Sequence, residues 1–168
     1  MGLEQLAYLA EIGGVILVVA TLAFLVIQIQ QSTKATRSAT SQAIHEHIGE
    51  VYSLIVENPD FSVVFVKGMR DPESLSPAET AQFFAYWVSA CLAMQNLRAQ
   101  IKEGIVSSDL MDALSSQFIN MSPSAGFQSF WKQRKNLLSA EFRAYMESEL
   151  FGKSPTEGFK PYYDDDAR

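Results

Sequence analysis

The chain has 168 residues and a net charge of −6, and 48% of its residues are hydrophobic, 19% charged and 11% aromatic. This composition fits one small domain with an unusually apolar segment, and it excludes a wholly disordered or collagen-like chain. A single cysteine excludes an intramolecular disulfide and a multi-cysteine zinc site, and the acidic balance argues against a nucleic-acid partner.

The first predicted element is a membrane-spanning helix within residues 1–33. Ile12–Ile27 is apolar except for Thr21, and no charged residue occurs over residues 12–33. About 20 apolar residues suffice for a helix to cross the hydrocarbon core of a bilayer. A buried core helix and a cleaved signal peptide are the alternatives. A signal peptide needs a basic start, however, and residues 1–11 contain no Lys or Arg.

The charges beside this apolar run predict its orientation. Lys34 and Arg37 are the first basic residues of the chain and follow the run directly. Basic flanks stay on the cytoplasmic side of a membrane. We therefore expect a single-pass protein of the cell inner (plasma) membrane, with its N-terminus outside and residues 34–168 in the cytoplasm. Ala10 and Gly14 form a small-xxx-small pair, a weak indication that two such helices approach closely.

Helical periodicity continues after the predicted span. No Pro or Gly interrupts residues 15–48, so the helix is expected to run on into an amphipathic segment. This helix should stop at Asn58, because the residue before a proline disfavours helical backbone. A short second helix is then expected from Pro59, ended by Gly68.

The longest predicted helix of the remaining chain begins at Ser76 and runs to about Lys102, with Gly104 as its stop. Ser76 and Glu79 have the spacing of a capping box. The helix is apolar on two sides, and the run Phe83–Met94 is polar only at Ser89. Because this run is short for a membrane span, we interpret it as a core helix, with a second span as the alternative.

Three further helices complete the predicted all-α fold. Ser107 or Ser108 is expected to cap the first, residues 123–126 to break the chain, and Ser139 to cap the last, which Gly152 ends. The predicted organisation has three parts: residues 1–33, with the tail and transmembrane helix; residues 34–152, a cytoplasmic bundle of about five helices; and residues 153–168, an extended or mobile acidic tail that contains Asp164–Asp166.

Residue types that carry chemistry are sparse. His45 and His47 are the only histidines, and their spacing of two places them about 200° apart on a helix, so they cannot share a metal ion. Glu46 or His47 with Glu50 leaves an acid–base or metal pair conceivable, since residues three or four apart meet on a helix. Cys91 lies among apolar residues, with no cation nearby to activate it. We therefore expect no catalytic residue, cofactor or metal.

Two sets of residues remain as candidate binding sites. A bundle interior can hold a small apolar ligand, and the expected pocket residues are then Tyr86, Trp87, Gln95 and Asn96. Contact with anionic lipid headgroups is the second possibility. Its expected residues are Lys34 and Arg37 beside the span, and Lys132, Arg134 and Lys135 in a later basic cluster.

Several segments of the chain carry a resemblance to a known family. They are NPDF at Asn58–Phe61, KGMRDPESLSPAE at Lys67–Glu79, NLRAQIKEGIVSSDL at Asn96–Leu110, GFQSFWKQR at Gly126–Arg134 and SAEFRAYMESEL at Ser139–Leu150. In these the chain resembles a family of small bacterial membrane-anchored all-helical proteins of unknown function. The resemblance covers most of the chain and implies the fold given above. Its landmarks are turns, caps and core aromatics, so it implies no activity and no catalytic residue.

These observations favour an interaction or accessory protein that is anchored in the membrane and docks a protein partner or a second copy of itself. The alternative is a membrane-tethered sensor, in which a small apolar ligand occupies the bundle and a continuous helix relays its presence. An enzyme that uses Glu46, His47 and Glu50 is a third, weaker hypothesis.

Overall fold

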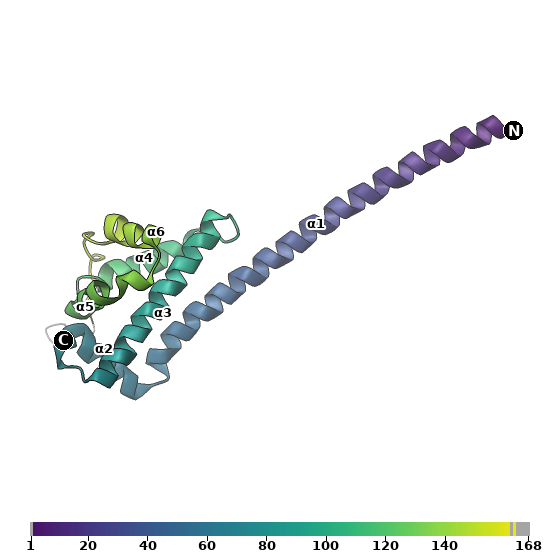
Figure 1. The fold of residues 1–168 in the computed structure, drawn as a ribbon. Helices are drawn as coiled ribbons and strands as arrows, with labels where there is room; N and C mark the ends of the chain where they lie inside the picture. Colours follow the sequence, from purple (N-terminus) through teal and green to yellow (C-terminus); the bar gives the residue numbers. More distant parts are fainter. Residues whose placement is uncertain (1, 162, 164–168) are drawn as a thin grey trace. The chain divides into compact units, whose positions relative to one another are not determined.

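The computed structural model describes residues 2–161 and Tyr163, with the side chains of Leu6, Ala7, Leu9 and Ala10 left out. Over these residues the chain is helical and contains no strand, which confirms the all-α class (Figure 1). The Ala10 side chain, on which the predicted pair with Gly14 depends, and the predicted acidic run Asp164–Asp166 fall outside what the structure describes. The chain divides into two compact units, Met1–Thr40 and Ser41–Arg168. We call them the N-terminal segment and the C-terminal domain.

Helix α1 (Leu3–Val56) contributes residues to both units. In the N-terminal segment, every described side chain up to residue 39 is exposed. The hydroxyl of Thr21, the polar residue of the apolar run, donates a hydrogen bond to the carbonyl oxygen of Leu17 at 2.8 Å and is therefore satisfied within the helix. Among the described residues, one helix is long and apolar enough to cross a membrane. It is the part of α1 that begins at Glu11, where an 18-residue window has a mean hydropathy of 2.6 and is 0% buried.

The last part of α1 belongs to the C-terminal domain, where Ile44, Ile48 and Val51 are buried on one face. The helix ends at Val56, two residues before the predicted stop. Asn58 instead caps the next helix, because its side-chain oxygen accepts a hydrogen bond from the Phe61 backbone N–H at 3.0 Å.

Helix α2 (Pro59–Arg70) continues past Gly68, so the prediction that this glycine ends the helix is wrong. Gly126 was likewise expected in a chain break, but it lies inside α5 (Ala125–Arg134). Both glycines serve close packing. A Cβ atom on Gly68 would lie 2.8 Å from the Phe83 ring, and one on Gly126 would meet the Gly68 carbonyl and lie 2.7 Å from the Met69 Cα.

Helix α3 (Pro77–Lys102) has the predicted bounds. Ser76 and Glu79 form the complete capping box, and Gly104 follows with a φ of +69°, a conformation that favours glycine. Both apolar stripes of α3 are buried, since Phe83, Phe84, Tyr86, Trp87, Cys91, Met94 and Leu97 all lie in the core. The structure therefore favours the core-helix interpretation over a second span.

The remaining elements are short: η1 (Pro72–Ser74), α4 (Asp109–Met121), η2 (Lys135–Leu137), α6 (Ala140–Tyr145) and the π-helical turn η3 (Met146–Leu150). Ser139 caps α6 as expected, with its hydroxyl oxygen accepting from the Phe142 N–H at 3.2 Å. Helix α3 contacts α2, α4 and α5, which makes it the centre of the domain.

An aromatic cluster fills the core around α3. The Trp87 ring lies 4.7 Å from Phe127, and the Phe65 ring lies 4.9 Å from Tyr86, both edge to face. Such pairs contribute about 0.5–1.5 kcal/mol each beyond the burial of their surface. The helices of this small domain are therefore held mainly by aromatic packing.

The residues after Gly152 contact the domain in their described part, although an extended or mobile tail was expected. The Thr156 N–H donates to the Asn120 side-chain oxygen at 2.7 Å, and Arg70 Nε donates to the Tyr163 carbonyl at 2.8 Å. Tyr163 is 9% exposed. The sequence offered little indication of this contact, because Pro, Gly and charge dominate the segment.

Candidate functional site

The four residues expected to form one ligand pocket do not meet in the structure. Trp87 lies in the aromatic core and is 4% exposed, and its Nε1 is buried with no hydrogen-bond partner in the residues that the structure describes. Tyr86 lines a small cavity. Gln95 lines a separate surface cleft, and Asn96 is exposed. Helix α3 therefore distributes these side chains over different faces.

The small cavity beside Tyr86 has a volume of about 30 Å³. Its walls come from α1, α3 and α4, and include Ile48, Ala90 and Leu114. Tyr52 also lines it, and burial raises the pKa of this tyrosine. A ligand pocket usually measures about 300–1,000 Å³, so this cavity is on the scale of one or two water molecules. Nothing in it favours an internal ligand.

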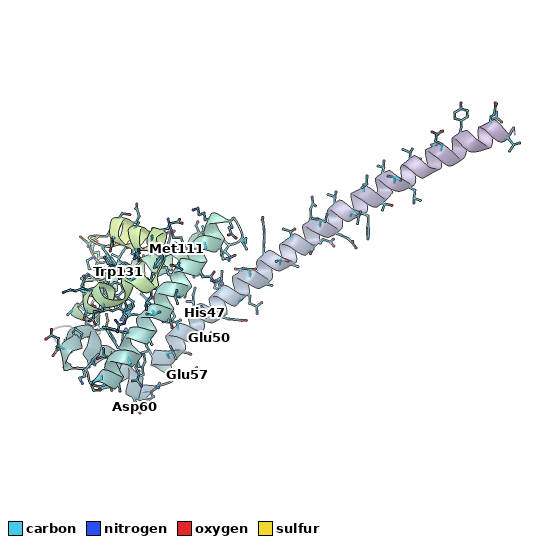
Figure 2. All side chains as sticks on the ribbon, viewed as in Figure 1. His47, Glu50, Glu57, Asp60, Met111 and Trp131 are labelled. Atoms are coloured by element: carbon cyan, nitrogen blue, oxygen red, sulfur yellow. The ribbon has the colours of Figure 1, made fainter. Side chains whose placement is uncertain are left out.

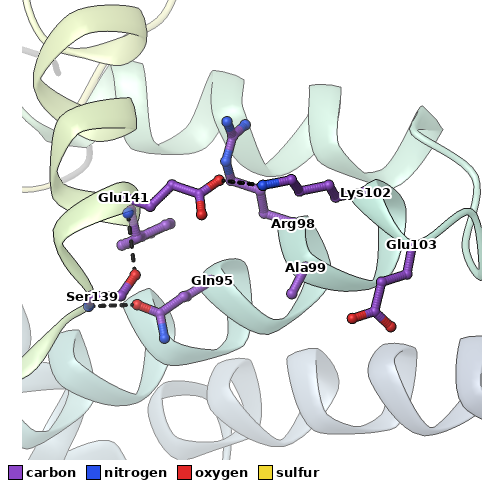
Figure 3. A pocket seen from close by; sticks show the side chains of 8 residues that line it. Gln95, Arg98, Ala99, Lys102, Glu103, Ser139 and Glu141 are labelled. Atoms are coloured by element: carbon purple, nitrogen blue, oxygen red, sulfur yellow. Dashed lines mark hydrogen bonds and ion pairs between the residues drawn. The ribbon is translucent and has the colours of Figure 1, made fainter.

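The cleft that Gln95 lines is much larger, at about 570 Å³ (Figure 3). It lies between the C-terminal half of α3 and the start of α6. Its lining residues are Gln95, Arg98, Ala99, Lys102, Glu103, Ser139, Glu141 and Phe142. The cleft thus combines two cations, two carboxylates, an amide and a hydroxyl, and the sequence analysis did not identify it as a whole.

Two contacts join the walls of this cleft. The Ser139 backbone N–H donates to the Gln95 side-chain oxygen at 2.9 Å, which ties the start of α6 to α3. Lys102 Nζ donates to Glu141 Oε1 at 3.2 Å across the opening, and both side chains are well exposed. An exposed ion pair of this kind contributes about 0.2–1 kcal/mol to the free energy of unfolding, so it stabilises the cleft only slightly.

Arg98 is the unusual residue of the cleft. Its guanidinium carbon lies 3.9 Å from the centre of the Tyr145 ring, and the Tyr145 hydroxyl is in turn 3.1 Å from the Ser115 hydroxyl. Arg98 Nε is buried and has no hydrogen-bond partner among the described residues. The three residues come from α3, α6 and α4: the Tyr145 ring of α6 contacts the guanidinium, and Ser115 of α4 contacts the Tyr145 hydroxyl.

The sequence analysis did not identify Arg98 as a site residue, although the sequence contains part of the information that was needed. Gln95, Arg98 and Lys102 are spaced three and four apart, so they share one face of a helix. That spacing was available as an indication. Ser139 and Glu141 reach the same cleft from α6 through tertiary packing, which one sequence does not predict.

The basic cluster at the end of α5 separates over different surfaces. Lys132 and Lys135 line one surface cleft of about 760 Å³, whereas Arg134 lines another and lies 5.4 Å from the Phe84 ring. Lys135 donates to Glu147 at 2.8 Å, and this ammonium, followed by the Trp131 Nε1–H, lowers the pKa of the Glu147 carboxyl.

The other predicted residues lie apart from these clefts. Lys34 and Arg37 are exposed on the N-terminal segment. His47 Nδ1 lies 3.4 Å from Glu50 Oε2, and both side chains are exposed on α1 (Figure 2). Cys91 is fully buried, and burial raises the pKa of its thiol above the usual value. The described residues contain no group of three or more His, Cys, Asp or Glu that could hold a metal ion.

Comparison with known proteins adds no relative: no family model matches the chain, and neither a curated protein nor a solved structure is significantly similar to it. The function is therefore inferred from the residues described above.

Proposed function

We propose that this protein is a single-pass membrane-anchored interaction or accessory protein. In this proposal a helix within residues 1–33 spans the cell inner membrane, and residues 34–152 form a cytoplasmic bundle of about five helices that docks a protein partner or a second copy of the chain. The resemblance of its turn and cap motifs to small bacterial membrane-anchored proteins supports the same assignment.

The observation that carries the proposal is the exposure of Ile12–Ile27. These side chains surround the helix on all sides, and Leu17 is 69% and Phe24 58% exposed. The run contains eleven Ile, Leu, Val or Phe residues. Each contributes about −0.3 to −0.6 kcal/mol to insertion into a bilayer, so the total is about −3 to −7 kcal/mol. Exposure of these apolar side chains to water is unfavourable, whereas their insertion into a bilayer is favourable.

Lys34 and Arg37 support the proposed orientation. Both follow the apolar run and are exposed, and no basic residue precedes it. Basic residues next to a span stay in the cytoplasm, where each contributes about 1 kcal/mol through attraction to anionic lipids. Reporter domains fused to either end test this orientation. A cytoplasm-active reporter should function at the C-terminus only, and activity at the N-terminus would reverse the proposed topology.

The direct test begins with fractionation of cells that produce the native chain. We expect the protein in the membrane fraction, resistant to an alkaline carbonate wash and released by mild detergent. Mass spectrometry of the detergent extract should then show a stoichiometric partner or a homo-oligomer. Protein in the soluble fraction before any detergent is added would contradict the anchor, and a monomer without a partner would contradict the interaction role.

A further inference from the structure

We propose that the cleft between α3 and α6 binds a small monocarboxylate, with Arg98 as the residue that pairs with the carboxylate. This inference is independent of the proposed membrane anchor, because every lining residue lies in the C-terminal domain. At about 570 Å³ the cleft has the size of an ordinary small-molecule site.

The first argument is the state of the Arg98 guanidinium. Within the described part of the chain no hydrogen bond or ion pair reaches Arg98, although its Nε is buried. A guanidinium has five N–H donors in a planar fork and keeps its charge at any physiological pH. Planar oxyanions match this fork with two parallel hydrogen bonds. Arg98 therefore lines the cleft with the donor set that a carboxylate requires.

The second argument is that this guanidinium is already positioned. It lies over the Tyr145 ring at 3.9 Å, and the Ser115 hydroxyl, 3.1 Å from that of Tyr145, fixes the ring. Stacking on an aromatic face restrains an arginine that would otherwise sample many rotamers. Less conformational freedom is therefore lost when an anion binds, which is a property of preorganised recognition residues.

The remaining charges of the cleft select a ligand with one negative charge. Lys102 and Glu141 pair with each other at 3.2 Å (Figure 3), and within the described part of the chain Arg98 and Glu103 are the lining ions without an ion pair. A phosphate monoester carries close to two negative charges, of which Arg98 could match only one, and Glu103 would oppose the other. A monocarboxylate places its single charge on Arg98, and its body can rest on Ala99 and the edge of Phe142.

The test is a titration of the full chain in detergent micelles with sodium benzoate, at constant ionic strength. The readout is the NMR resonance of the Arg98 Nε–H, assigned by its loss in the Arg98→Lys variant. Benzamide serves as the neutral control, since it has the same shape without the charge. We expect a saturable shift with benzoate at millimolar concentrations and none with benzamide. Equal responses to both compounds, or no saturable shift, would overturn the proposal.

Variants make the assignment specific. Arg98→Gln should weaken benzoate binding at least tenfold, because it removes the charge-assisted pair. The matched control Lys153→Gln removes one exposed cation outside the cleft and should change the affinity less than twofold. Glu103→Gln should strengthen binding about threefold, because it removes a negative charge from the lining. This opposite sign tests the site even if Arg98→Gln fails to fold, and unchanged binding in Glu103→Gln would then refute it.

Discussion

The apolar run of the N-terminal segment and helix α3 of the C-terminal domain are both rich in apolar residues, but their surroundings are opposite. Both are helices with apolar residues on more than one side. In the first, every described side chain is exposed, whereas in the second six large apolar or aromatic residues are buried. The difference lies in the neighbours, because α2, α4 and α5 contact α3 and cover both of its stripes.

This contrast teaches how a core helix is distinguished from a membrane-spanning helix. The distinction depends on whether the rest of the chain contains side chains that can pack against it. Phe65 from α2, Phe118 from α4 and Phe127 from α5 all lie within about 6 Å of Trp87, ring centre to ring centre. Residues 1–40 contain no amphipathic helix that could do the same for Ile12–Ile27. A bilayer is the environment that covers a helix without requiring a protein partner.

The largest effect should come from breaking the aromatic core. Phe127 is fully buried, and its ring lies 4.7 Å from Trp87 and 5.7 Å from Phe151. Phe127→Ala should lower the free energy of unfolding by about 3–5 kcal/mol, through lost burial and the cavity that remains. Urea denaturation followed by tryptophan fluorescence in mild detergent measures the change.

The matched control for this substitution is Leu137→Ala, since Leu137 is 61% exposed. It should alter the free energy of unfolding by less than about 0.5 kcal/mol. Similar losses for the two variants would mean that the aromatic cluster is not the main source of stability. Membrane retention should be the same in both, because neither residue belongs to the apolar run.

A charge in the apolar run should have the next largest effect, and it should change membrane retention rather than the stability of the domain. Leu22→Arg places a cation near the middle of the predicted span and should disfavour insertion by about 3 kcal/mol. Against a total of about −3 to −7 kcal/mol for the eleven apolar residues, membrane retention should fall but not disappear. Retention after a carbonate wash measures this, and a second arginine at Val18 should abolish it.

Val63→Arg is the control for Leu22→Arg, because Val63 is 68% exposed in the C-terminal domain. It should leave both membrane retention and the free energy of unfolding within error of the wild type. If Leu22→Arg instead destabilised the domain and left retention unchanged, the apolar run would have to pack against protein.

Gly126→Ala should have a somewhat smaller effect. The added Cβ would meet the backbone of Gly68 and Met69, which cannot turn aside as a flexible side chain would. Overpacking of this kind costs about 1–3 kcal/mol of unfolding free energy. Gly49→Ala is the control of opposite sign, since a Cβ at this helical position meets nothing within 4 Å and should stabilise the chain by up to about 1 kcal/mol. Equal thermal shifts for both variants would contradict a close α2–α5 crossing.

These glycines also show where sequence reasoning succeeds and fails. The capping box at Ser76, the stop at Gly104 and the all-α class depend on local backbone chemistry, so the sequence was sufficient to predict them. Glycine also commonly ends helices, but Gly68 and Gly126 lie inside helices. They are needed for close contact between helices that are distant in sequence. Arg98 escaped notice for the same reason, because its significance comes from Tyr145 and Ser115 on other helices.

The smallest expected effect is a pH dependence at the start of α3. The Ser76 backbone N–H, which donates to Glu79 Oε2 at 2.7 Å, is the main cause that lowers the pKa of the Glu79 carboxyl, and Lys67 at 3.2 Å adds to it. A carboxyl with a lowered pKa in the folded state stabilises the fold above its unfolded pKa. That contribution is lost as the pH falls through the folded pKa.

Glu79→Gln should therefore make the free energy of unfolding less dependent on pH between neutral pH and about pH 3. Denaturation curves across this range measure the change. Lys67→Gln should keep most of the wild-type dependence, because the Ser76 N–H remains as the principal hydrogen-bond donor. If Lys67→Gln removed the dependence as fully as Glu79→Gln, the ion pair rather than the helix cap would hold the carboxylate. The capping box would then be a consequence of the α2–α3 contact instead of a local start signal.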